Sequence, residues 1–163
     1  MTEERSAHII RQILAAIRYM HDKGLIHGNL RPEHIIYEDQ SEDSVKLTDF
    51  GIAQYEDELV GESKDRNLQS IDENPCAAPE LTTGKYSDRS DVWSVGVLTY
   101  RLLTGKFPFS NAEEDVFKTV QSIRLDFGDP VWNNKSEACK DFLRSLLNVD
   151  VDQRLTAKGA QKH

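Results

Sequence analysis

The sequence predicts a mainly α-helical single domain, a helical bundle around a central buried helix, with a small β-hairpin element. Three observations indicate this class. Apolar residues recur at helical spacing near the start of the chain, a later segment is apolar nearly all round, and short β-type runs are confined to residues 25–54. A chain of 163 residues fits one domain and can bury on the order of 70% of its unfolded surface.

The first expected element is an amphipathic helix over residues 6–23, ended by Gly24. Its apolar positions are Ile9, Ile10, Ile13, Leu14, Ile17 and Met20. Short strands are expected at residues 25–26, 35–37 and 45–48, flanking an irregular loop. Residues 54–74 hold almost no apolar side chains and carry seven acidic residues against two basic ones, so we expect a solvated, mobile loop there.

The central helix is expected to begin near Asp91, in "DVWSVGVLTYRLLTG", because a helix that is apolar all round runs through a core. Asn111 with Glu114 three residues later predicts a capping box and a further helix. Ser136 opens a helix whose apolar residues fit the i, i+3, i+4, i+7 pattern, and Thr156 caps a last short helix. We find no internal repeat and no second domain.

Charge and composition restrict the partners and the location. The formal net charge of −8 and the lack of any Lys/Arg run argue against nucleic acid and anionic membranes, and favour protein partners with basic patches. No apolar run approaches the ~20 residues of a membrane span and no secretory signal follows Met1, so we expect a cytoplasmic protein. Cys76 and Cys139 lie far apart without a C-x-x-C partner, which favours reduced thiols over a disulfide or a metal site.

Three short motifs occur in a fixed order: "IHGNLRPEHI" at 26–35, "DFG" at 49–51 and "APE" at 78–80. They are followed by "SDVWSVGVLTYRLLTGKFPF" and "DQRLTA". Together they resemble the C-terminal lobe of a eukaryotic protein kinase, and the helical tail is similar to the calcium/calmodulin-dependent and calcium-dependent protein kinase group. The resemblance covers residues 1–163 and implies an activation-loop-like acidic segment at 52–77. No G-x-G-x-x-G and no Val-Ala-x-Lys lysine precede the first helix, so the N-terminal β lobe is expected to be absent.

The resemblance also shows which working groups differ. The family's catalytic loop reads His-Arg-Asp-Leu-Lys-Pro-Glu-Asn, and here residues 27–34 read His-Gly-Asn-Leu-Arg-Pro-Glu-His. Asn29 stands at the position of the proton-accepting Asp, and a neutral amide cannot take a proton. Arg31 keeps the charge of the family's Lys in a different shape. His34 stands at the position of the magnesium-binding Asn and offers a nitrogen, which magnesium disfavours.

Two further departures concern activation and substrate binding. Gly28 replaces the Arg that in the family binds a phosphate on the activation loop. Alignment of the segment before "APE" places Glu73 where a Thr touches the catalytic base. The same alignment places Cys76 where a Tyr shapes the substrate floor. Docking of a peptide substrate is therefore in doubt as well.

Other family positions are retained. Asp49 is the candidate magnesium ligand and nucleotide-site residue, although a turn Asp that caps backbone amides explains the same residue. His27, Phe50 and Gly51 match structural positions beside the site. The alignment places Asp91 where the family's Asp holds the catalytic-loop backbone.

Glu80 and Arg154 match a buried ion pair that ties the "APE" segment to the late helices. The resemblance implies a catalytically impaired kinase-like lobe, or pseudokinase, that acts by protein binding or regulation. The alternative is the C-terminal lobe of a slow serine/threonine kinase, and a pure scaffold is a third reading. No cofactor is expected for this chain alone, whereas ATP and magnesium would require an N-terminal lobe.

Overall fold

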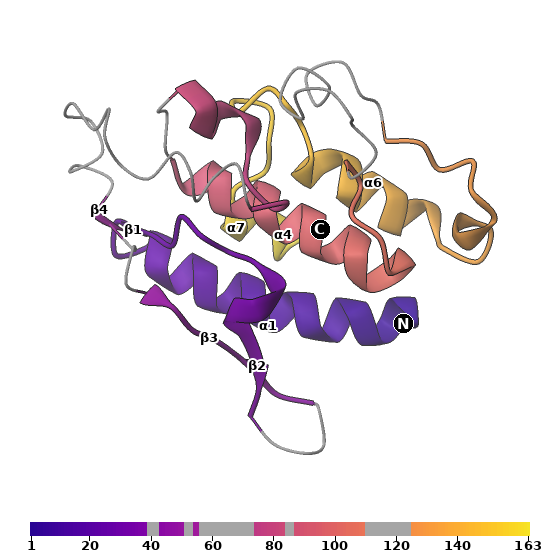
Figure 1. Ribbon diagram of the computed structural model, residues 1–163, viewed down its shortest axis with the longest axis horizontal. Helices are drawn as coiled ribbons and strands as arrows, with labels where there is room; N and C mark the ends of the chain where they lie inside the picture. Colours follow the sequence, from indigo (N-terminus) through magenta and orange to yellow (C-terminus); the bar gives the residue numbers. More distant parts are fainter. Residues whose placement is uncertain (39–42, 51–53, 56–73, 84–86, 110–124) are drawn as a thin grey trace.

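The protein is described by a computed structural model at residues 1–38, 43–50, 54–55, 74–83, 87–109 and 125–163. Its main helices are α1 (Glu3–His21), α4 (Asp88–Thr104) and α6 (Glu137–Leu146), followed by the short α7 (Ala157–Ala160). Figure 1 shows α1 and α4 side by side and antiparallel, with α6 on the other side of α4. The helix α7 packs against both α1 and α4. The predicted helical bundle around one central helix is confirmed.

Two small antiparallel sheets accompany the bundle. The strand β2 (Ile35–Tyr37) pairs with β3 (Val45–Leu47) as the predicted hairpin, which projects from the helices in Figure 1. The strand β1 (Leu25–Ile26) pairs with β4 (Gln54–Tyr55), which the sequence assigned to the acidic loop. That assignment was wrong for these two residues. A strand of two residues is too short to show the alternation of apolar and polar side chains by which strands are predicted. The rest of the predicted loop, 56–73, lies outside the described residues.

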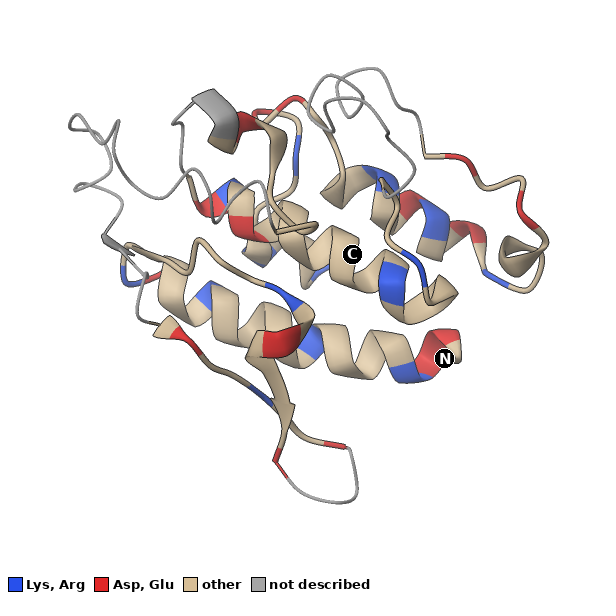
Figure 2. Cartoon of the chain, viewed as in Figure 1, with Lys and Arg blue, Asp and Glu red and all other residues tan. Residues whose placement is uncertain are grey.

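The core forms where α1, α4 and α6 meet. All six predicted apolar positions of α1 are buried, and the central turns of α4 are buried on every face. Figure 2 shows charged residues at the two ends of α4 and along α1 and α6. A Cβ atom on Gly96 would lie 2.8 Å from Leu147, so this glycine permits the close approach of α4 to the end of α6.

The helix ends agree with the sequence in part. Ser136 and Thr156 cap α6 and α7 as predicted, since their hydroxyl oxygens accept hydrogen bonds from Cys139 N and Gly159 N, both at 3.0 Å. The start of α1 lies earlier than predicted, because the Thr2 hydroxyl accepts from Arg5 N at 3.2 Å. Gly24 ends the turn after α1 with φ of 69°.

Short 3-10 turns occupy Pro32–His34 (η1), Pro79–Thr83 (η3) and Pro130–Trp132 (η4). The central helix α4 starts three residues before the predicted Asp91. The capping box predicted at Asn111 and Glu114 lies outside the described residues. Within the described ranges, none of the helices combines the length and the apolar character that crossing a bilayer requires.

Candidate functional site

Asp91 holds the start of the catalytic-loop-like segment, residues 27–34. Its carboxylate is buried, with Oδ1 accepting from Gly28 N at 2.8 Å and Oδ2 accepting from His27 N at 2.9 Å. His21 Nε2 lies 2.8 Å from the same Oδ2 atom. The first turn of α4 therefore fixes the backbone of the loop against the end of α1, as expected for Asp91.

Gly28 has a structural role that the sequence reading missed. Its φ is 77°, in the left-handed region that side chains with a Cβ adopt only at a cost. Apart from its two chain neighbours, none of the described residues has an atom within 4 Å of the position that a Cβ would occupy, so the constraint is the backbone and not space. The glycine thus permits a backbone conformation at residue 28 that would strain a residue with a Cβ.

Asn29 stands at the centre of the site and is held on both sides of its amide. Its Oδ1 accepts from Asn74 Nδ2 at 3.1 Å, and its Nδ2 donates weakly to Asp49 Oδ2 at 3.5 Å. Its backbone N–H donates to His27 Nδ1 at 3.3 Å, which leaves His27 Nε2 to donate to Thr48 O at 3.1 Å. A neutral amide in these contacts orients its neighbours but offers no proton-accepting base.

Asn74 is a site residue that the sequence reading did not identify. The alignment placed Glu73 beside the loop, but Glu73 lies outside the described residues and Asn74 makes the contact. Its Oδ1 also accepts from Cys76 N at 2.8 Å, which closes a local turn. The Asn-Pro pair at 74–75 is a turn signal in the sequence that could have pointed to this residue.

Asp49 and His34, the two candidate metal positions, contact each other. His34 Nε2 lies 3.1 Å from Asp49 Oδ2, and His34 Nδ1 lies 2.8 Å from Asn29 O. Both ring nitrogens therefore face oxygen acceptors, an arrangement satisfied fully when both nitrogens donate. Asp49 has a φ of 63°, in the left-handed region that few residues other than glycine, asparagine and aspartate adopt.

This donor set is a poor match for a pair of magnesium ions. Magnesium prefers oxygen ligands in octahedral geometry, and one of the two positions here presents an imidazole. Asp49 Oδ2 already faces both His34 and Asn29, so this oxygen is engaged by nitrogen groups of the site itself. Among the described residues, no three His, Cys, Asp or Glu side chains form a metal-binding group.

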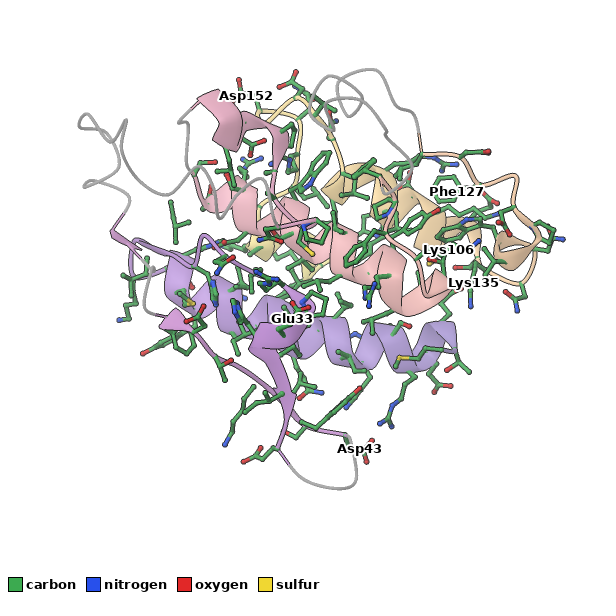
Figure 3. All side chains as sticks on the ribbon, in the orientation of Figure 1. Glu33, Asp43, Lys106, Phe127, Lys135 and Asp152 are labelled. Carbon is green, nitrogen blue, oxygen red and sulfur yellow. The ribbon has the colours of Figure 1, made fainter. Side chains whose placement is uncertain are left out.

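Arg31 is partly committed to its own loop. Its Nε donates to Glu33 Oε2 at 2.9 Å, and this hydrogen bond holds the pKa of Glu33 below its ordinary value. Figure 3 labels Glu33 on the short turn η1, which overlaps α1 in this view. Because Arg31 is still 31% exposed, its guanidinium keeps access to solvent on the side away from Glu33.

His27 and Phe50 contact each other but differ in burial. Their ring centroids are 5.5 Å apart, and His27 is completely buried. Phe50 is 51% exposed, so only one side of its ring is packed. Gly51 lies outside the described residues. His27 thus occupies the packed position that the resemblance implies, whereas Phe50 presents an apolar surface beside the site.

The expected ion pair between Glu80 and Arg154 is present behind the site. Arg154 makes two hydrogen bonds to the Glu80 carboxylate, and its side chain is completely buried. The contact joins η3 to the loop between α6 and α7. We assign it a structural role, because its two groups are committed to each other and the Arg154 side chain is completely buried.

A loop held by a buried Asp, followed by a DFG Asp and an APE ion pair, defines a protein-kinase-type site. Comparison with known families gives the same result: the protein kinase domain matches residues 1–163. The chain therefore belongs to the protein kinase domain family.

Similar proteins include kinases from several lineages. The chain is 37% identical to a calcium/calmodulin-dependent protein kinase type 1 of Macrobrachium nipponense, over 99% of this chain and 46% of that protein. It is 36% identical to a probable myosin light chain kinase of Dictyostelium discoideum, over 96% of this chain and 44% of that protein. A CDPK-related protein kinase of Daucus carota is 36% identical over 99% of this chain and 26% of its own length. The chain spans less than half the length of these relatives.

Proposed function

We propose that this chain is the C-terminal lobe of a protein-kinase-like protein, that it is catalytically impaired, and that it acts by binding or regulating other proteins. The observation that carries the proposal is the hydrogen-bonded set Asn74–Asn29–Asp49–His34. In this set the position of the proton acceptor and both metal positions are occupied by groups that satisfy one another. The side chains of the site therefore hold one another in place through these hydrogen bonds.

The size of the expected impairment follows from the chemistry of Asn29. A positioned general base accelerates a reaction by roughly 10²–10⁴-fold, and an amide supplies none of this. The imidazole of His34 at the second metal position removes a further oxygen ligand. The two changes act on different parts of phosphoryl transfer, so neither compensates for the other.

The proposal assigns ATP and magnesium binding to a protein that also has an N-terminal lobe, because the groups that clamp nucleotide phosphates in this family lie on that lobe. For residues 1–163 alone we expect no phosphoryl transfer, even with Asn29→Asp and His34→Asn combined, since we assign the groups that hold the γ-phosphate to the N-terminal lobe. Turnover by that double variant of the 163-residue chain would contradict the assignment. The partner class we propose is a cytoplasmic protein with a basic patch, matching the net charge of −8.

A second candidate function is a slow serine/threonine kinase. It is favoured by two retained groups, the Asp49 carboxylate at the DFG position and the Arg31 guanidinium, which is free on its solvent side. In this reading an unorthodox base, or none, replaces Asn29. Its substrate would be a protein hydroxyl, as for the relatives named as serine/threonine kinases.

Phosphate incorporation separates the two functions. The longest form of the protein found in its source cells is incubated with radiolabelled ATP and magnesium, beside the same form carrying Asp49→Ala. We expect equal, background-level incorporation in both. Phosphate incorporation that is present in the natural protein and absent from Asp49→Ala would overturn the proposal that the protein is catalytically impaired, and would support the slow kinase.

A further inference from the structure

A cavity of about 260 Å³ lies between α1, α4, α6 and α7, and it shares no lining residue with the candidate site. Its walls are largely apolar and include Ile10, Leu14, Leu103 and Phe142. All of its lining residues except Gln161 and His163 lie on these four helices, so the cavity belongs mainly to the helical bundle. Ligand pockets are commonly found between the helices of bundles.

The polar groups inside this cavity are satisfied by the protein. Ser6 Oγ donates to Thr2 O at 2.9 Å, and Thr99 Oγ1 donates to Val95 O at 2.7 Å. Both bonds return to the backbone one turn earlier, so neither hydroxyl needs a partner in the cavity. Water is held in a cavity by several unsatisfied polar groups, and this interior offers an apolar surface instead.

The charged groups that line the cavity differ in whether another residue already pairs with them. Glu3 is committed, because its carboxylate accepts from Ser136 N at 2.9 Å and from Ser136 Oγ at 2.6 Å. His163 Nε2 lies 3.1 Å from Asp141 Oδ2, which lies outside the cavity. Arg11 is exposed, and it has no hydrogen bond or ion pair with any residue that the structure describes. Among the lining residues, Arg11 is therefore an exposed cation that makes no hydrogen bond or ion pair with another described residue.

We propose that this cavity binds a small apolar carboxylate, with the hydrocarbon part between the four helices and the carboxylate on Arg11. Both parts of such a ligand match the cavity. Burial of hydrocarbon in an apolar interior is favourable, and a guanidinium forms paired hydrogen bonds with a carboxylate. The inference is independent of the proposed function, because it uses no residue of the kinase-type site.

The volume limits the size of the ligand. An apolar cavity of roughly 150 Å³ in another protein accommodates benzene. The present cavity of about 260 Å³ is large enough for a ring with a short chain. Hydrocinnamate has this form, with its carboxylate at the end of a two-carbon chain, and hydrocinnamamide is a neutral probe of nearly identical shape.

The test is isothermal titration of both probes into the 163-residue chain and into three variants. Arg11→Gln removes the cation, Ala138→Phe fills the cavity from an exposed position on α6, and Lys158→Gln removes a cation that does not line the cavity. Both Gln variants change exposed side chains on helices, and thermal unfolding verifies that each variant is folded.

We expect hydrocinnamate to bind the natural chain about 3- to 10-fold more tightly than the amide, a ratio set by one charge-assisted contact at a solvent-accessible mouth. Arg11→Gln should abolish this preference and leave the amide's affinity unchanged, Ala138→Phe should abolish binding of both probes, and Lys158→Gln should change neither. Absence of binding by both probes to the natural chain would overturn the proposal. Binding that survives Ala138→Phe, or a preference that survives Arg11→Gln, would overturn it as well.

Discussion

The guanidinium of Arg154 and the carboxylate of Glu80 face each other through two hydrogen bonds, with Nη1 2.6 Å from Oε1 and Nη2 3.0 Å from Oε2. The exposed fraction of the two side chains is 0% and 9%. Arg154 also donates to Asn148 O and Arg89 O, at 2.8 and 2.9 Å. One buried cation thus connects η3, the start of α4 and the loop before α7.

Arg154→Ala should destabilise the protein strongly. Removing one partner of a buried pair leaves the other charge uncompensated and costs about 3–5 kcal/mol. For a domain of this size, the loss should lower Tm by roughly 6–20 °C. Thermal unfolding measured by circular dichroism tests this. Arg144→Ala is the matched control, because Arg144 is exposed and stacks on Phe127; an equal effect of both variants would show that the buried pair contributes nothing special.

Gly96→Ala should also destabilise the protein, through packing instead of charge. The added methyl group would lie 2.8 Å from Leu147 and 3.0 Å from Leu146, so α4 and α6 would have to separate. Overpacking of this kind costs about 1–3 kcal/mol. Urea unfolding gives the free-energy change. The control is Gly128→Ala, whose methyl group would have the Asp126 carboxylate as its nearest neighbour, at 3.0 Å. Wild-type stability in Gly96→Ala would contradict the proposed close approach.

The two cysteines should react slowly in the folded protein. Burial raises the pKa of Cys76 to about 12 and that of Cys139 to about 11, so little reactive thiolate exists near neutral pH. Reaction with an aromatic disulfide reagent should be at least about 100-fold slower in the native chain than in urea, and faster at Cys139 than at Cys76. The rate should rise about tenfold for each pH unit between pH 7 and pH 9, since both thiol pKa values lie above this range. Fast native labelling of Cys76 would contradict its burial.

Glu3 should give α6 a pH-dependent anchor. Its hydrogen bonds to the Ser136 hydroxyl and backbone N–H lower the pKa of its carboxyl below the ordinary 4.5. A lowered pKa in the folded state means that the stabilisation is complete above about pH 4.5 and is lost as the pH falls through the folded-state value. The stability difference between the natural protein and Glu3→Gln should therefore be present at pH 7 and shrink in acid. A difference that is constant from neutral to acid pH would contradict this role of Glu3.

Much of the fold could be predicted because burial leaves a periodic pattern. The apolar spacing of α1 and the all-round apolar character of α4 report directly which faces are covered. Gly24, Ser136 and Thr156 mark element ends through local hydrogen bonds and a positive φ, which also depend on neighbouring residues alone. The strand β4 could not be predicted, because its pairing with β1 is made by backbone groups of distant segments.

The candidate site was also predicted only in part: its residues could be identified from the sequence, but the contacts between them could not. Residue types at family spacing identified Asn29, His34 and Asp49, and the chemistry of an amide and an imidazole follows from the residue type. That these groups bond to one another depends on how three loops meet, and no local pattern encodes it. Asn74 was missed for this reason, since its contact with Asn29 spans 45 positions in the sequence.

The most direct test of the account restores the lost groups where catalysis can be measured. The longest form of the protein found in source cells is compared with its Asn29→Asp/His34→Asn variant in phosphate transfer from ATP to a mixed serine/threonine peptide library. We expect no detectable transfer by the natural form and transfer at least about 100-fold above background by the variant, the lower bound for a positioned base. Equal, substantial transfer by both forms would contradict the claim that Asn29 and His34 impair catalysis.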